Sequence, residues 1–425
     1  MISPYFSVVI PTFNRSDLFP YTVQSILNQT FEDFEIVLSD NCSSDNTPEI
    51  AQQFKDPRFK YVRTPRHFTI ADSCEFVRMK ASGRSIILLS DDDVLMKRAL
   101  ERYAAETEDC DTDFLFSSIA EYRDASYLGP DKNSVTCPGF SGSSRVLSAD
   151  EFVRPLFKLK PKFFMHPSAC IFPKKIADYV ERRTGRFFWT NGMEYSAFPI
   201  CAVLAKRIVK IDLPLAILGR TAKTWGTNMG LCNPGKEKIQ ELINDVDHIR
   251  RFAPLHNFTM INLMTEGMLT AKHLFPNEFA TYEFDERRYL RSTMRELRKR
   301  ETLKVDVSTE INETLQYSSK YPDMESDLRS TNGREESKKA SLVHLIRSGI
   351  EKSLGRKVRE RIHAFQLRQQ LERGMAGQRF RASGDAFGFS NILECSKFFD
   401  KWVVTPESNR PSPSWAAQGG SMARS

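Results

Sequence analysis

The chain has 425 residues, of which 40% are hydrophobic and 11% are aromatic. A chain of this length can bury a sizeable core, as two domains or as one domain with a long appendix. The formal net charge is +7, and residues 341–382 alone carry ten Lys or Arg against three Glu, so the rest is close to neutral. We therefore expect an anionic partner for the appendix only: a membrane surface, an acidic protein or a nucleic acid.

The cysteines and the apolar runs exclude further classes of protein. The eight cysteines are scattered without a C-x-x-C pair or a histidine at zinc-like spacing, which argues against a disulfide scaffold or a zinc module. The chain begins without a basic segment, and its apolar runs stay well short of the ~18 residues that a membrane-spanning helix needs. The sequence predicts a cytoplasmic enzyme with reduced thiols, no signal peptide and no membrane span.

Strand and helix patterns alternate regularly over residues 1–120, which predicts a parallel sheet with crossover helices. Residues 121–233 mix the two patterns less regularly, and we expect them to extend the same sheet and to form the second side of a cleft. The expected strands of the first part are Phe6 to Ile10, Glu35 to Ser39, Phe59 to Arg63, Ser85 to Leu89 and Phe114 to Ser117.

The remainder is predicted to be helical and then irregular. Helical patterns at 235–252, 258–274 and 286–300 give a helical extension over residues 234–317. Residues 318–340 are polar and poor in large apolar groups, which predicts a flexible linker. A basic helical segment, 341–373, repeats an apolar residue every fourth position, and residues 374–425 are predicted to be a disordered tail.

Polar features follow the first two strands, at the sheet edge where open α/β sheets bind ligands. Pro11 ends the first strand, and in the segment Pro11-Thr12-Phe13-Asn14-Arg15 the last two side chains can donate to a phosphate or a base. Asp40 follows the second strand and could accept the imide N–H of uracil or thymine, although a helix cap is the alternative for the acidic residues of this loop.

The third feature is the run Asp91-Asp92-Asp93 after an apolar strand. Three adjacent carboxylates repel one another unless a cation compensates. Mg²⁺ or Mn²⁺, which prefer oxygen ligands, could bridge such carboxylates to a diphosphate. A solvated acidic loop or a helix cap would explain this run equally well if it stood alone.

Together with Q-S-I-L-N-Q in the first helical pattern and S-S-D-N-T after Asp40, these motifs resemble family 2 glycosyltransferases of the GT-A fold, over residues 5–95 and more loosely to about Asn228. The resemblance implies an α/β domain with a mixed, mostly parallel sheet flanked by helices over residues 1–233. Residues 1–120 would bind the nucleotide sugar and 121–233 the acceptor, and the later residues would form a helical extension. Asp40 would read the base, and Asp91 and Asp93 would lie around the metal, with Asp93 as the expected principal ligand.

The resemblance also implies the reaction and its partners. We expect an inverting transfer from a UDP- or dTDP-sugar to a hydroxyl of a glycan or lipid-linked glycan. Single sugars should be added, because the Q-x-x-R-W motif of processive synthases is absent. Pro11, Thr12, Asn14, Arg15, Asp40, Asp91 and Asp92 would contact the donor. The resemblance does not extend to the basic C-terminal segment, whose positive charge and interspersed Leu, Ile and Val predict attachment to the inner face of an anionic membrane or, alternatively, an ordinary solvated helix that packs on the catalytic domain. No nucleic acid is expected as a partner.

Two departures and two alternatives complete this comparison. Asn41 and Ser90 stand where many members carry further acidic residues. A nucleotidyltransferase or a nicotinamide dehydrogenase would need a glycine-rich loop after a strand, which the sequence lacks. A non-catalytic binding protein of the same fold, acting through its basic C-terminal region, is the alternative from another class.

An inverting transfer needs a base for the acceptor hydroxyl, placed across the cleft from the diphosphate. Glu194 follows an aromatic, glycine-containing loop and opens an apolar helical pattern, so we assign it this role, with Asp178 and Glu181 as the next candidates. The alternative is that Glu194 only favours the helix N-terminus. The isolated His67 and His166 receive no role, and the Phe157 to Phe164 stretch is interpreted as core or lid.

Overall fold

A computed structural model describes residues 3–224, 252–255, 257, 259–302, 304–330, 365, 367 and 379–402. Its centre is a sheet in which β1 (Phe6–Thr12), β2 (Phe34–Asp40), β3 (Phe59–Arg63) and β4 (Ser85–Leu88) pair in parallel in the order β4-β1-β2-β3. All four strands lie where the sequence predicts them. The carboxyl ends of β1 and β4 therefore meet at one edge, which brings the Pro11 turn next to the acidic run.

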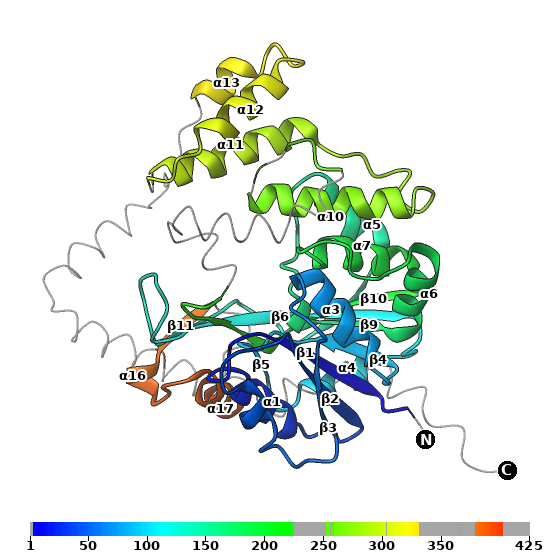
Figure 1. The fold of residues 1–425 in the computed structure, drawn as a ribbon, viewed down its shortest axis with the longest axis vertical. Helices are drawn as coiled ribbons and strands as arrows, with labels where there is room; N and C mark the ends of the chain where they lie inside the picture. Colours follow the sequence, from blue (N-terminus) through cyan, green and yellow to red (C-terminus); the bar gives the residue numbers. More distant parts are fainter. Residues whose placement is uncertain are drawn as a thin grey trace, which may run out of the picture.

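Helices cover both faces of this sheet, as the alternation of buried residues along β1 requires. Val9 packs in one core cluster with α3 (Ile70–Met79), whereas Val8 and Ile10 pack in the other with α1 (Phe19–Leu27). Figure 1 shows α3 and α1 on opposite sides of β1. The short α2 (Thr47–Ala51) and α4 (Ala99–Glu106) complete the first part, together with β5 (Val94–Leu95).

The second part extends the same sheet through β6 (Asp113–Arg123), which pairs along one edge with β9 (Cys170–Pro173) and β7 (Ser134–Cys137) and along the other with β10 (Arg207–Arg220). The register of β10 against β6 shifts around Pro214. The other elements are β8 (Ser144–Leu147), α5 (Ala149–Phe157), the 3₁₀ turn η1 (Pro167–Ala169), α6 (Lys174–Thr184) and α7 (Glu194–Leu204).

Four helices follow in the described residues between 252 and 330: α10 (Met260–Leu274), α11 (Glu286–Thr302), α12 (Ser308–Ser318) and α13 (Glu325–Ser330). The predicted helices at 258–274 and 286–300 are confirmed, and the one at 235–252 lies almost wholly outside the described residues. α10 packs against α7 so closely that a Cβ on Gly267 would lie 2.6 Å from the Cβ of Tyr195. The extension is therefore in direct contact with the helix that begins at Glu194.

The structure corrects the predictions for two C-terminal segments. The expected linker 318–340 contains α13, whose Leu328 is fully buried together with Met324 just before it. The expected disordered tail 374–425 contains β11 (Phe380–Ser383), α16 (Gly384–Phe387) and α17 (Ile392–Trp402). Aromatic residues spaced along a polar, glycine-rich stretch explain the error, since Phe380, Phe389, Phe398 and Phe399 are all buried. The basic segment 341–373 lies outside the described residues apart from residues 365 and 367.

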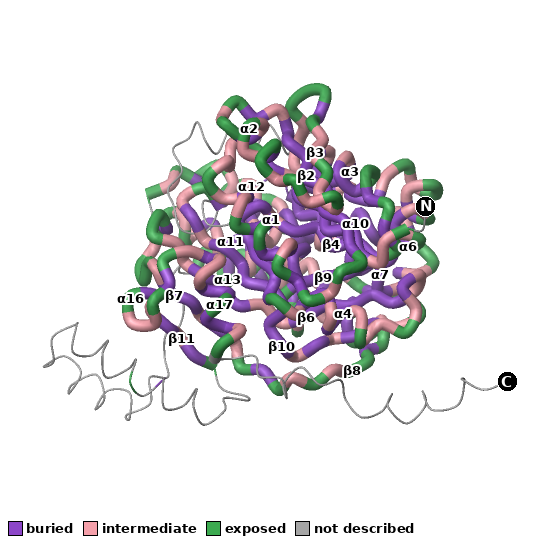
Figure 2. Tube along the Cα trace, turned by 90° about the horizontal axis from the view of Figure 1, so that it is seen from below, coloured by how far each residue is buried: buried purple, intermediate pink, exposed green. Residues whose placement is uncertain are grey.

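β11 pairs with β7 at the edge of the sheet, which gives the order β11-β7-β6-β9-β4-β1-β2-β3. Figure 2 shows the buried residues running through the strands of this sheet and the helices packed on them. The predicted α/β architecture, a mixed sheet with its longest pairings parallel and a helical C-terminal region, is confirmed. In the described ranges, no helix combines the length and the apolar content that crossing a bilayer would need.

Candidate active site

A cleft of about 590 Å³ opens at the carboxyl ends of β1 and β4. Its polar part is lined by Arg15 from the turn after β1, by Asp91 and Asp92 from the loop after β4, and by Lys223 beyond β10. Glu194, at the start of α7, lines the same cleft. The structure therefore brings together side chains that lie more than 200 residues apart in the sequence.

Arg15 holds the first two aspartates of the acidic run. Its Nη1 donates to Oδ1 of Asp91 at 2.7 Å and lies 3.2 Å from Oδ2 of Asp92, while Nη2 donates to the carbonyl oxygen of Lys223 at 2.6 Å. Burial raises the pKa of Asp91, and the charge of Arg15 opposes that rise. The carboxylates of Asp91 and Asp92 thus both face the guanidinium of Arg15. Their negative charge would also attract a bound cation.

Asp92 is further held by Thr224, whose hydroxyl donates to Oδ2 of Asp92 at 2.7 Å. Two carboxylates with hard oxygen atoms, open to a cleft, fit Mg²⁺ or Mn²⁺, because these ions commonly take one or two protein carboxylates and complete their coordination with phosphate and water. Within the described residues no group of three His, Cys, Asp or Glu converges to form a complete metal cage.

Asp93 has a different environment from the one expected of a principal metal ligand. Its side chain is fully buried and does not line the cleft. Oδ1 accepts from the backbone N–H of Gly219 at 2.8 Å, and Oδ2 accepts from the hydroxyl of Ser168 at 2.5 Å. Burial and the charge of Asp92 raise the pKa of Asp93 well above its usual value. Asp93 fastens the acidic run to β10 and η1, and Asp91 and Asp92 are the carboxylates that face the cleft.

Asp40 is also more enclosed than the sequence suggested. Its side chain is fully buried, Oδ1 accepts from the backbone N–H of Ser43, and Oδ2 accepts from Tyr61 and Arg63, each bond being 2.7 Å long. The neighbouring Asn41 lines the cleft, whereas Asp40 is not among the lining residues. Since a carboxylate offers about four acceptor positions, three of those of Asp40 are occupied by the protein.

Some residues of the turn after β1 line the cleft, and others hold the turn in place. Pro11 and Thr12 line the cleft, as expected of donor-contacting residues. Asn14 does not: it has a left-handed backbone, with φ at 53°, and its Oδ1 accepts from the backbone N–H of Ser44 at 2.8 Å. Asn and Asp tolerate this conformation better than other non-glycine residues. Asn14 therefore joins the loops that follow β1 and β2.

Glu194 begins α7, and burial raises the pKa of its carboxyl to about 7. The other two candidate bases, Asp178 and Glu181, lie on α6 and pair with the buried guanidinium of Arg78. Neither lines the cleft. Among the three carboxylates named from the sequence, Glu194 is the one that lines the cleft.

Several cleft residues were missed by sequence reasoning. His67 packs against Phe13 with ring centroids 4.5 Å apart, and both line the cleft. His166 lines it too, and burial lowers its pKa to about 4, so the imidazole is neutral. Phe164, half of whose surface is exposed, stacks on His166. No local pattern marks any of these residues, because the fold alone brings them to the cleft.

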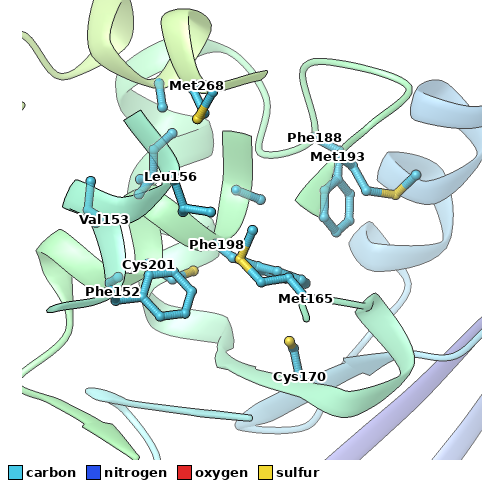
Figure 3. Packing of buried hydrophobic residues seen from close by; sticks show 14 of the residues in the cluster. Phe152, Val153, Leu156, Met165, Cys170, Phe188, Met193, Phe198, Cys201 and Met268 are labelled. Atoms are coloured by element: carbon cyan, nitrogen blue, oxygen red, sulfur yellow. The ribbon is translucent and has the colours of Figure 1, made fainter. Parts of the chain in front are cut away.

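Apolar residues form another part of the lining. Met165 and Met193 line the cleft and also belong to a buried core cluster. In Figure 3, Met193 lies near Phe188 and Met165 near Phe198. Met260 and Leu263 of α10 also line the cleft. A Cβ on Gly192 would lie 2.8 Å from Cγ of Leu263. The helical extension therefore contributes directly to the site.

Comparisons with known proteins agree with the motifs in the first part of the chain. Residues 7–180 match the family model of glycosyl transferase family 2. A Campylobacter jejuni protein, the GalNAc(5)-diNAcBac-PP-undecaprenol beta-1,3-glucosyltransferase, is 38% identical over 100 residues, which are 23% of this chain and 32% of that protein. The putative teichuronic acid biosynthesis glycosyltransferase TuaG of Bacillus subtilis is 33% identical over 101 residues, 23% of this chain and 40% of that protein.

A third relative is an Escherichia coli protein, UDP-Glc:alpha-D-GlcNAc-diphosphoundecaprenol beta-1,3-glucosyltransferase WfgD, at 30% identity over 22% of this chain and 38% of its own length. The chain thus spans less than half of the length of these relatives. Among solved structures, S. aureus TarS 1-349 with UDP-GlcNAc covers 77% of this chain and 92% of its own, at 13% identity and a TM-score of 0.43. The mannosyltransferase PcManGT of Pyrobaculum calidifontis, with GDP-Man and Mn²⁺, covers 66% and 74%, at 15% identity and a TM-score of 0.37.

Proposed function

Residues 7–180 of this chain belong to glycosyl transferase family 2, and from this premise we propose that the protein transfers a sugar from a nucleotide diphosphate donor to an acceptor hydroxyl with inversion. The observation that carries the proposal is the cleft itself. It combines two paired acidic residues, the cationic side chains of Arg15 and Lys223, and a carboxyl group with a pKa of about 7.

In the proposed reaction, Glu194 as the carboxylate accepts the proton of the acceptor hydroxyl. The hydroxyl oxygen forms a bond to the anomeric carbon, the bond from that carbon to the phosphate oxygen breaks, and its electron pair leaves with the nucleoside diphosphate. A divalent cation held by Asp91 and Asp92 would neutralise charge on the diphosphate. Arg15 and Lys223 supply further positive charge at the same end of the cleft.

We further propose that the donor carries uracil or thymine. Because Asp40 is fully buried, it would accept the ring imide N–H only after the partly exposed side chain of Arg63 moves aside and frees an acceptor position. Cytosine has no such donor, so CDP should bind the wild type more weakly than UDP or dTDP. Equal binding of the three nucleotides in a titration would argue against this assignment.

The acceptor is proposed to be a glycan or lipid-linked glycan. Two relatives whose names specify diphosphoundecaprenol-linked acceptors support this choice. Attachment to the inner face of an anionic membrane through the basic segment 341–373 is a related proposal that rests on the sequence alone. Co-sedimentation with anionic liposomes tests it, and binding that survives deletion of that segment would contradict it.

The deciding experiment is a donor hydrolysis assay with a panel of UDP-, dTDP- and GDP-sugars. Wild-type protein with Mn²⁺ should release nucleoside diphosphate slowly even without an acceptor, and EDTA should stop the release. Absence of hydrolysis with every donor, with and without an acceptor extract, would favour a binding protein that has kept the fold. Full activity in EDTA would agree with the assignment as a transferase and contradict the proposed metal requirement.

A further inference from the structure

The C-terminal segment 379–402 lies outside the family-matched residues 7–180, yet it packs on strands and helices from both parts of the catalytic domain. β11 pairs with β7 from Phe380 opposite Cys137 to Ser383 opposite Ser134. The backbone N–H of Gly384 then donates to the carbonyl of Asn133 at 2.8 Å, and a Cβ on Gly384 would lie 2.1 Å from the carbonyl of Phe389. This tight turn leads the chain from the sheet edge to α17.

α17 packs against α1, β5 and β10, and Figure 1 shows it beside α1 and below β5. Each of these three elements contacts or adjoins the acidic run. Thr22 of α1 donates to the carbonyl of Asp91 at 2.9 Å, β5 begins directly after Asp93, and Gly219 of β10 donates to Oδ1 of Asp93 at 2.8 Å. The helix thus lies behind the loop whose front faces the cleft.

Gly219 is where the helix, the strand and the loop meet. A Cβ at this position would lie 1.9 Å from the carbonyl oxygen of Asp92 and 3.3 Å from Cδ1 of Ile392. The first residue of α17 therefore lies next to Gly219, the residue that also approaches the carbonyl of Asp92. At the other end of α17, burial raises the pKa of Asp400, while the backbone N–H and charge of Lys97, two residues after β5, act in the opposite direction. Both ends of the helix approach the chain around the acidic run.

We infer that residues 379–402 position the acidic run: Ile392 packs behind Asp92 and keeps Asp91 and Asp92 directed into the cleft. The effect of this positioning on catalysis rests on the proposed function, whereas the packing of Ile392 against the acidic run can be tested without it. Glycine at 219 is required because no larger residue leaves room for the Asp92 carbonyl. The acidic run would then need a segment more than 280 residues further along the chain to hold its active geometry.

The test compares two substitutions in full-length protein. Ile392→Ala removes the side chain next to Gly219. Phe398→Leu is the matched control, because in the described part of the chain the aromatic rings that contact Phe398 belong to the same C-terminal segment: Phe380, Phe387, Phe389 and Phe399. Hydrogen exchange of the backbone amides of residues 93–97, several of which bond to Ser90, Ser25 and Leu215, reports the order of the loop without any substrate.

We expect Ile392→Ala to speed exchange in residues 93–97 by roughly tenfold or more and to lower the turnover of donor hydrolysis more than it changes donor KM. Phe398→Leu should leave both unchanged. Ile392→Val, which removes Cδ1 alone, should give a smaller change in the same direction and serves if the alanine variant does not fold. Equal effects of the two positions, or unaltered exchange in Ile392→Ala and Ile392→Val, would overturn the inference.

Gly219→Ala probes the same contact from the strand. Its Cβ must displace the Asp92 carbonyl, so exchange in residues 93–97 should again rise, and its effect should not add to that of Ile392→Ala because both act on one group. Strictly additive effects would count against the inference. If wild-type protein hydrolyses no donor, the exchange data still decide the positioning, and only the proposed function fails.

Discussion

The substitution Glu194→Gln distinguishes two possible roles of Glu194: a catalytic base, or a residue that only stabilises the N-terminus of α7. The amide cannot take a proton from the acceptor, so turnover should fall by roughly 10²-fold or more while donor KM stays near that of the wild type. Because the base acts as the carboxylate and burial raises its pKa to about 7, wild-type kcat/KM should rise about tenfold per pH unit below pH 7 and level off above it. The variant should lose this dependence.

The same substitution should stabilise the protein at alkaline pH. The pKa of Glu194 is about 7 in the folded protein, against 4.5 for a glutamate whose pKa is unperturbed, so the folded state binds this proton more tightly than the unfolded one. That contribution is fully present below pH 4.5 and is lost as the pH rises through 7. At about 1.4 kcal/mol per pKa unit, the difference between the folded and unfolded pKa values corresponds to about 3 kcal/mol in the free energy of unfolding. Glu194→Gln should therefore be more resistant to urea than wild type at pH 8, by up to about 3 kcal/mol, and show little difference at pH 4.5.

Glu49→Gln is the control, since Glu49 is an exposed acidic residue in the first turn of α2. This substitution should lower the free energy of unfolding by at most about 1 kcal/mol, because it removes a charge near the helix dipole, and it should leave turnover unchanged. If Glu194→Gln instead behaves like Glu49→Gln, with near-normal turnover and a small loss of stability, the assignment of the base is wrong.

Three further substitutions test the acidic run and its surroundings. Asp92→Asn should lower Mn²⁺-dependent hydrolysis by on the order of 10²-fold or more with little loss of stability, because the amide lacks the charge that holds the cation; retained activity would contradict it. Asp93→Asn should cost about 1–3 kcal/mol in urea unfolding, since an amide cannot accept from both Gly219 and Ser168, and unaltered stability would refute this. Arg78→Met should cost about 3–5 kcal/mol by leaving the carboxylates of Glu75, Asp178 and Glu181 without their buried partner, and a loss below 1 kcal/mol would show the network to be unimportant.

The first part of the fold could be read from the sequence because its signals are local. Val8, Ile10, Ile36 and Leu38 are spaced as strand residues that alternate between two faces, and each strand ends at a residue that the motifs mark. The parallel pairing of β1 with β2 and β4 follows from the connecting helices. Local spacing therefore predicted both the strands and the edge at which the cleft opens.

The tail could not be predicted in this way, because its order depends on a partner distant in sequence. Phe380, Phe398 and Phe399 are separated by glycine-rich and polar stretches and show no helical or strand period that dominates. They become core residues when β11 pairs with β7 and α17 lies on α1. Composition measures what a segment can bury by itself, and it misses apolar residues that are buried by a surface built elsewhere in the chain.

The order of the three aspartates shows the same limit at atomic scale. In the sequence, Asp91, Asp92 and Asp93 are equivalent carboxylates, and repulsion among them indicates only that some compensation must exist. The fold supplies three different forms of it: Arg15 pairs with Asp91 and Asp92, Thr224 donates to Asp92, and Gly219 and Ser168 enclose Asp93. Since each of these partners lies between 75 and 132 residues from the aspartate that it contacts, the roles of the three carboxylates follow from the tertiary structure and not from the motif.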